Sequence, residues 1–272
     1  MTPWNRDEFS RMFAPAAIGM VHLLPLPGSP LWMGDLEVVR NRALADATAL
    51  TQAGFRAAMV ENFQDVPFFP GRVPAVTVAA MTAVIVDILR KFPDLLLGVN
   101  VLRNDVQAAL GIAAATGANF VRVNVHVGEA VTDQGTIRGQ ACRTLRLRKD
   151  LGVERVGILA DVRVKHARPL VERPLAEEAR DLRLRGLADC IIVSGPATGQ
   201  GADPEELRLL RQALPDCPLL VGSGMTSENV SQFRPWADGY IVGTSLREQT
   251  TGANASAISS VKSTEFLASL AG

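Results

Sequence analysis

The chain has 272 residues, of which 47% are hydrophobic, and its 28 basic side chains balance 28 acidic ones. A chain without excess positive charge gives no electrostatic reason to bind nucleic acid or an anionic membrane, so neither is expected as a partner. Three scattered cysteines without a CxxC pair argue against a disulfide framework. No apolar run reaches the ~20 residues that span a bilayer, so we expect a cytoplasmic protein without an integral membrane segment.

Residues 1–16 form an N-terminal extension to the main pattern. They include acidic side chains and lack the apolar run of a signal peptide. Within them, residues 5–13 predict a short amphipathic helix whose apolar side chains Phe9, Met12 and Phe13 pack on the underside of the molecule.

Eight short apolar runs then alternate with segments of helical length. The predicted strands are residues 18–23, 57–60, 95–101, 120–125, 156–160, 190–193, 219–221 and 239–242. Short apolar runs are typical of parallel strands that helices cover on both faces. Between them, apolar residues recur at helical spacing, and Gly54 and Gly117 mark the ends of two such helices. Asp203 and Pro204 mark the start of another, as cap and first residue.

Eight β–α units fit two architectures, a closed barrel and a doubly wound open sheet. An open sheet usually carries GxGxxG after its first strand, whereas here the first strand runs into HLLPLPG at residues 22–28. A (β/α)8 barrel needs about 250 residues, which this chain supplies without remainder. We therefore predict an α/β protein in which residues 1–272 form a single (β/α)8 TIM barrel, with residues 247–256 as a loop before the last helix.

Polar side chains gather where the predicted strands end, and the active site of a (β/α)8 barrel lies at the C-terminal ends of its strands. The catalytic candidates expected there are His22, Glu61, Asp161, Lys165 and His166. The residues expected to bind substrate are Asn62, Asn100, Arg103, Asn124, His126 and Ser194. All three histidines of the chain fall at strand ends, which favours a functional rim over scattered structural histidines.

Two glycine-containing turns after the last two strands are the most specific signal. They are Gly222, Ser223 and Gly224 after the seventh strand, and Gly243, Thr244 and Ser245 after the eighth. Glycines let backbone N–H groups approach an anion, and the loops at these two positions are the usual phosphate site of the fold. Thr226 is interpreted as the cap of a following helix, whose N-terminus would add positive potential. The sequence therefore predicts a barrel of the phosphate-binding type with a small phosphorylated ligand.

The catalytic chemistry stays open between several alternatives. Lys165 can form a Schiff base with a carbonyl substrate or neutralise an anion. Glu61 and Asp161 are candidate general bases, and the histidines can move protons near neutral pH. A divalent metal held by His22, Glu61 and Asp161 is a further alternative, but ligands from separate strands leave no diagnostic spacing, so no cofactor is assigned. The turn at 132–135 either closes over the pocket or is a plain surface turn.

The same segments resemble the BtpA/SgcQ family. The matching stretches are MVHLLPLPGSP (20–30), MVENFQDVPFF (59–69), GVNVLRND (98–105), FVRVNVHVGEAVTDQG (120–135), ILADVRVKHA (158–167), IIVSGPATG (191–199), VGSGMTSENV (221–230) and DGYIVGTSLR (238–247). They cover most of the chain, and the resemblance implies a barrel of the phosphate-binding kind. Family members often continue after the eighth strand with a lysine and an Asp-Gly turn, where this chain has REQTTG at 247–252.

The resemblance implies less about function. The cyanobacterial branch is associated with biogenesis or stability of photosystem I, and the SgcQ branch with a carbohydrate phosphotransferase gene cluster. Our first hypothesis is an enzyme that acts on a sugar phosphate or nucleotide-like metabolite by isomerase- or lyase-type proton transfer. The alternatives are a non-catalytic accessory factor for a membrane complex such as photosystem I, and a sensor that binds a phosphorylated ligand without turnover. A homo-oligomer stays open, since two-fold dimers are common.

Overall fold

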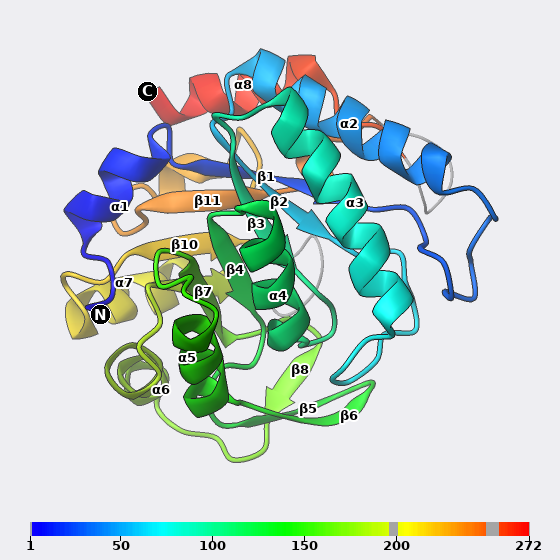
Figure 1. Ribbon diagram of the computed structural model, residues 1–272. Helices are drawn as coiled ribbons and strands as arrows, with labels where there is room; N and C mark the ends of the chain where they lie inside the picture. The colour runs from blue at the N-terminus through cyan, green and yellow to red at the C-terminus, as the bar shows by residue number, and fades with distance from the viewer. Residues whose placement is uncertain (1, 196–200, 249–255, 272) are drawn as a thin grey trace.

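The computed structural model describes residues 2–195, 201–248 and 256–271, and its centre is a closed barrel of parallel strands (Figure 1). The eight strands are β1 (Ala17–His22), β2 (Ala57–Glu61), β3 (Leu96–Asn100), β4 (Phe120–Val123), β7 (Gly157–Arg163), β9 (Cys190–Ser194), β10 (Leu219–Gly222) and β11 (Gly239–Val242). Each pairs with the next barrel strand along the chain, and β11 closes onto β1. All eight predicted runs form these strands, so the predicted (β/α)8 fold is confirmed.

Helices alternate with the barrel strands along the chain. They are α1 (Arg6–Phe13), α2 (Leu36–Ala53), α3 (Ala75–Lys91), α4 (Val106–Thr116), α5 (Ala141–Asp150), α6 (Leu175–Arg180), α7 (Pro204–Ala213) and α8 (Ser260–Ala271), with a π segment η1 (Asp181–Arg185) and 3-10 segments η2 (Val230–Gln232) and η3 (Thr244–Leu246). Gly54 and Gly117 end α2 and α4 in the left-handed conformation, as predicted. Asp203 caps α7 ahead of Pro204, also as predicted. No helix within the described residues combines the length and apolar character needed to cross a membrane.

The loop predicted between the last strand and the last helix spans residues 247–256. Its central part, 249–255, lies outside the described residues, and α8 follows at Ser260.

The N-terminal helix α1 closes the N-terminal end of the barrel, as predicted. Phe9 and Phe13 stack with ring centroids 4.6 Å apart, and Phe13 meets Phe120 at the start of β4 edge-on at 5.5 Å. Both join the inward-facing apolar side chains of the strands. The assignment of Met12 to the packed face is wrong, because its side chain is exposed. Phe9 and Phe13 are four residues apart and share one stripe, whereas Met12 is turned by about 100° from Phe13.

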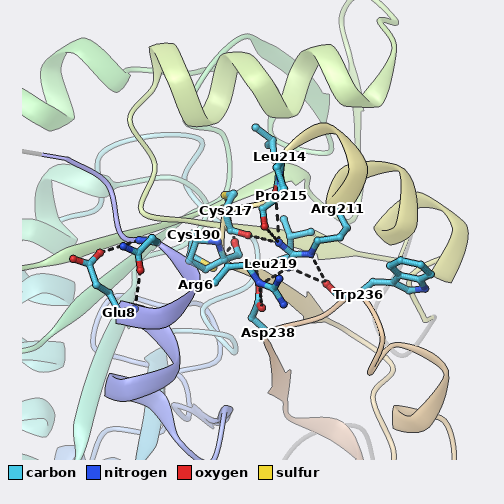
Figure 2. Close-up of polar contacts among 12 residues, drawn as sticks. Arg6, Glu8, Cys190, Arg211, Leu214, Pro215, Cys217, Leu219, Trp236 and Asp238 are labelled. Atoms are coloured by element: carbon cyan, nitrogen blue, oxygen red, sulfur yellow. Dashed lines mark hydrogen bonds and ion pairs between the residues drawn. The ribbon is translucent and has the colours of Figure 1, made fainter.

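A charged network fixes α1 to the same end of the barrel (Figure 2). Arg211 of α7 donates to the carbonyl oxygens of Cys217 and Trp236 at 2.8 and 2.9 Å, and it pairs with Asp238 just before β11. The other carboxylate oxygen of Asp238 accepts from Nε of Arg6 in α1 at 2.7 Å. The network therefore joins α7 and the segments that precede β10 and β11 to the N-terminal helix.

A three-stranded antiparallel sheet lies on the C-terminal side of the barrel, and the sequence did not predict it. It consists of β5 (Glu129–Thr132), β6 (Gly135–Arg138) and β8 (Ala167–Pro169), in the order β6-β5-β8 (Figure 1). The predicted turn at 132–135 joins β5 to β6, with Gly135 at φ 93°. These strands are short and largely exposed, so they lack the continuous apolar pattern of the barrel strands.

Alternation along the strands divides the barrel interior into layers. The inward-facing apolar residues are Ile18, Met20, Ala57, Met59, Phe120, Leu159, Cys190, Ile192, Leu220 and Ile241. Because alternate residues of a strand face the same side, the inward positions nearer the C-terminal mouth belong to polar residues. These are His22, Glu61, Asn100, Arg122, Asp161 and Ser194. The strand pattern thus places a polar layer above an apolar one.

Candidate functional site

Strand register brings the carboxylate of Glu61 between two polar neighbours. His22 of β1 is aligned with Glu61 of β2, and Glu61 with Asn100 of β3. Asn100 Nδ2 donates to Glu61 Oε1 at 3.1 Å, and His22 Nε2 lies 3.7 Å from Oε2. Glu61 and Asn100 are buried. The carboxylate is therefore held in place at the mouth of the barrel.

His22 stands beside this carboxylate as a neutral ring. It stacks on Phe63 with centroids 4.3 Å apart. Burial lowers the pKa of His22 well below its ordinary value, and the positive charges of Arg247 and Lys165 lower it further. The approach of His22 to Glu61 is therefore not an ion pair.

The carboxylate of Asp161 is fully occupied. Arg122 forms two parallel bonds with it, from Nε to Oδ2 at 2.9 Å and from Nη2 to Oδ1 at 2.8 Å. Asn124 Nδ2 and Ser194 Oγ each donate to it at 3.2 Å. Both charged side chains are buried. A carboxylate held by four donors orients Arg122 and is poorly suited to accept a proton from a substrate.

Arg122 is a site residue that the sequence prediction missed. The predicted site residues were those that follow the strands, whereas Arg122 lies within β4. The signal was a single arginine in the otherwise apolar run FVRV, two residues beyond the inward-facing Phe120.

Two pockets meet at the polar layer. The first, which we call the lysine pocket, has a volume of about 420 Å³, and its polar lining includes Glu61, Arg103, Arg122, Asn124, Asp133, Lys165 and His166. The second, which we call the cradle, has a volume of about 190 Å³ and is lined by His22, Glu61, Arg122 and the turns at 223–226 and 243–245. Glu61 and Arg122 line both pockets, so the two spaces adjoin.

The two turns that line the cradle have an unusual backbone conformation, and several of their amides have no partner in the described chain. Ser223 and Gly224 both have positive φ, 70° and 66°, a conformation that costs a non-glycine residue of order 1 kcal/mol or more and is concentrated at functional sites. Within the described residues, the amides of Gly224, Met225, Thr244 and Ser245 donate to no protein acceptor. Ser245 Oγ donates to the Met225 carbonyl at 2.6 Å, which ties the two turns together.

The prediction that Thr226 caps the following helix is wrong, because the N-cap residue of the segment that follows, the 3-10 segment η2, is Asn229. Asn229 Oδ1 accepts from the Thr226 amide at 2.9 Å, and Thr226 Oγ1 accepts from the Asn229 amide at 3.3 Å. Side chains thus satisfy the backbone groups of a turn, and only the short 3-10 segment η2 follows. The cradle therefore depends on turn amides, and this turn does not supply the dipole of a full helix.

Lys165 follows β7 and reaches over the lysine pocket. Its ammonium lies 5.6 Å from the centroid of the Phe63 ring, and no acidic side chain of the described residues forms an ion pair with it. Burial lowers the pKa of Lys165, while the negative charges of Glu61 and Asp161 oppose that shift. The exposed side chain of His166 lines the same pocket, and its backbone has a positive φ of 56°.

Several predicted site residues lie away from both pockets. Asn62 accepts from the Leu102 amide at 2.7 Å and shapes a neighbouring loop. His126 is directed to the Gly186 carbonyl, 2.8 Å from its Nε2. Gly222 lies beneath the cradle, where an added Cβ would come within 3.1 Å of the Ser194 hydroxyl oxygen. Asn100, Asp161 and Ser194 line neither pocket; Asn100 contacts Glu61, and Asp161 contacts Arg122 and Ser194.

The three residues considered as metal ligands do not converge. Asp161 faces Arg122, whereas His22 and Glu61 lie at the cradle. Across the described part of the chain, no group of three His, Cys, Asp or Glu side chains is arranged to hold a metal ion.

The buried His126 predicts a pH-dependent stability. Burial lowers its pKa to about 4, against about 6.5 in the unfolded chain. The unfolded state then binds the proton more tightly, so stability falls as the pH drops through the window from 6.5 to 4. We expect the shifted pKa of His126 to lower the free energy of unfolding of the wild-type protein by about 2 kcal/mol when the pH falls from 7.5 to 5.

Urea unfolding at both pH values measures this effect. His126→Gln should lose less stability than wild type on acidification. An identical pH dependence in wild type and His126→Gln would contradict the assignment.

Comparison with known proteins places these features in a family. The sequence model of the BtpA family matches residues 14–271. The photosystem I biogenesis protein BtpA of Synechocystis is 48% identical over 230 residues, which are 85% of this chain and 79% of that protein. An uncharacterized protein of Thermococcus kodakarensis is 49% identical over 231 residues, 85% and 86% of the two chains. Among solved structures, phosphoribosyl anthranilate isomerase from Thermus thermophilus has a TM-score of 0.57 at 11% identity, covering 94% of this chain and 98% of its own, and this likeness shows the shared fold.

Proposed function

The chain belongs to the BtpA family, and we propose that this member is an enzyme that acts on a small phosphorylated metabolite by isomerase- or lyase-type proton transfer. One observation carries the proposal, namely that Glu61 and Arg122 line both the cradle and the lysine pocket. A ligand whose phosphate lies in the cradle would extend its carbon chain past Glu61 towards Lys165. Its reacting carbon would then lie between a carboxylate and an ammonium.

The cradle suits a phosphate because four of its turn amides have no acceptor within the described residues. The amides of Gly224, Met225, Thr244 and Ser245 would donate to phosphate oxygens. Arg122 lines the same space with its charge paired to Asp161, and the neutral His22 adds no charge of its own. Turns after the last two strands are the usual phosphate position in this fold.

In the proposed chemistry, Glu61 removes a proton from a carbon next to a carbonyl group. Asn100 holds the carboxylate in position, and the ammonium of Lys165 stabilises the negative oxygen that develops. The lowered pKa of Lys165 also fits an alternative in which its neutral amine forms a Schiff base. Borohydride reduction in the presence of a substrate distinguishes the two, because only a Schiff base is trapped covalently.

A second candidate function follows from the name of the Synechocystis relative. An accessory factor for a membrane complex needs a surface for its client, and Leu31, Met33, Val66 and Phe69 expose apolar side chains on the loops after β1 and β2. However, the uncharacterized Thermococcus relative is as similar to this chain as the Synechocystis protein is, so the name of one relative does not decide the function. We therefore favour the enzyme.

A thermal-shift screen tests the proposal. Each phosphorylated metabolite is paired with its dephosphorylated form, with and without divalent metals. A ligand at a hundred times its Kd adds about 2.7 kcal/mol of stability, which raises the Tm measurably. A rise with the phosphorylated member alone supports the enzyme and identifies compounds for turnover assays, which separate an enzyme from a sensor. A folded protein that responds to no phosphorylated compound would leave the accessory factor as the better account.

A further inference from the structure

Arg103 is a buried cation without an acidic partner. It is 4% exposed and lines the lysine pocket. A guanidinium carries five N–H donors, and the side chain of Arg103 uses one of them, from Nη2 to the Lys165 carbonyl at 2.5 Å. No carboxylate of the described residues lies within ion-pair distance of it. The other four donors have no acceptor among the residues that the structure describes.

The other buried arginines of the described chain are all paired. They form ion pairs as Arg122 with Asp161 at 2.8 Å, Arg148 with Asp189 at 2.8 Å, and Arg211 with Asp238. Burying a guanidinium without such a partner costs several kcal/mol. Arg103 is thus the exception among the buried arginines of the described chain, and its lack of an ion pair needs a specific explanation.

The remainder of the chain cannot supply the missing partner from its side chains. Residues 196–200 and 249–255 contain no aspartate or glutamate. Asp133, an acid that lines the same pocket, is exposed and accepts a hydrogen bond from Gln134, and it forms no ion pair with Arg103. Lys165, whose carbonyl contacts Arg103, is a second cation without an ion pair. Two neighbouring cations at one pocket are thus left for an anion from outside the chain.

We infer that the substrate is a phosphorylated carboxylic acid whose carboxylate is bound by Arg103, with Lys165 beside it. The part of this inference that concerns the phosphate group rests on the proposed function. The planar fork of a guanidinium matches a carboxylate through two parallel bonds. Apolar side chains, among them Leu31, Val66 and Phe68, form much of the remaining wall. This lining suits a flat carboxylate better than a second phosphate group. The phosphate of the substrate would instead be bound by the turn amides of the cradle.

Isothermal titration against matched probes tests the inference. The probes are 2-phosphoglycolate, 3-phosphoglycerate and 4-phosphoerythronate, each compared with the polyol phosphate of the same length, and a bisphosphate of each length. Wild type should bind the carboxylate of the best-fitting length about 10- to 100-fold more tightly than its polyol phosphate. Arg103→Gln should remove most of that preference, and Arg103→Lys should restore part of it.

The outcomes separate this inference from the proposed function. Equal binding of carboxylate and polyol phosphate keeps the phosphate cradle but overturns the carboxylate subsite, as does a preference for the bisphosphate. Absence of binding by every phosphorylated probe counts against the proposed function itself. If Arg103→Gln does not fold, Lys165→Met supplies the second variant, which should lower the carboxylate preference while retaining polyol phosphate binding.

Discussion

Replacement of Asp161 by alanine should lower the free energy of unfolding by about 3–5 kcal/mol. The carboxylate is the partner of the buried Arg122 and also accepts from Asn124 and Ser194. Its removal leaves a guanidinium charge in the barrel interior without compensation, together with unsatisfied donors. Urea unfolding at neutral pH measures the loss.

Two controls identify the cause of that loss. The double variant Arg122→Met with Asp161→Leu should be less destabilised than Asp161→Ala alone, because it leaves no unpaired charge. Glu205→Ala, which breaks the exposed pair with Arg208, should cost less than about 1 kcal/mol. If Asp161→Ala were no more costly than Glu205→Ala, the buried pair would not be the structural centre of the polar layer.

Glu61→Gln should abolish most turnover of any substrate that the screen identifies. The amide has nearly the same shape and can keep the contact with Asn100, but it cannot accept a proton. Loss of a general base lowers kcat by about 10²- to 10⁴-fold, and KM should change by only a few-fold because the phosphate contacts remain.

Steady-state kinetics on the variant and a matched control check this prediction. Glu265→Gln makes the same chemical change on the exposed face of α8 and should retain wild-type kcat. A Glu61→Gln enzyme with near wild-type kcat would remove Glu61 from the chemistry, and the base would then have to be sought among other groups of the lysine pocket.

The sequence predicted the barrel well because the barrel strands are continuous apolar runs between recognisable helix signals. Gly54 and Gly117 end their helices in the left-handed conformation that only glycine adopts without cost. The small antiparallel sheet escaped prediction because its strands are short and exposed. Local pattern therefore identifies elements that contribute to the core and misses those that lie on its rim.

The candidate site was predictable in position but less so in detail. The turns at 222–224 and 243–245 were recognised from glycines, whereas Thr226 was misassigned because the side-chain contacts of Asn229 decide its turn. Arg122 could have been found from strand alternation, two residues after Phe120. The sequence could not have shown that Arg103 lacks an ion pair, because ion pairing depends on three-dimensional packing. The same holds for His126, whose Gly186 partner is distant in sequence.

We propose above all that the turns at 223–226 and 243–245 bind a phosphate. An added Cβ at Gly243 would lie 3.3 Å from both His22 Cε1 and Met20 Cβ, so Gly243→Asp brings bulk and negative charge into the cradle. Gly111→Asp makes the same change in α4, where an added Cβ meets nothing within 4 Å. The most direct measurement is isothermal titration of wild type and both variants with a phosphorylated compound from the screen. We predict that Gly243→Asp loses affinity by about 100-fold or more while Gly111→Asp binds like wild type; a folded Gly243→Asp protein with wild-type affinity would contradict the account.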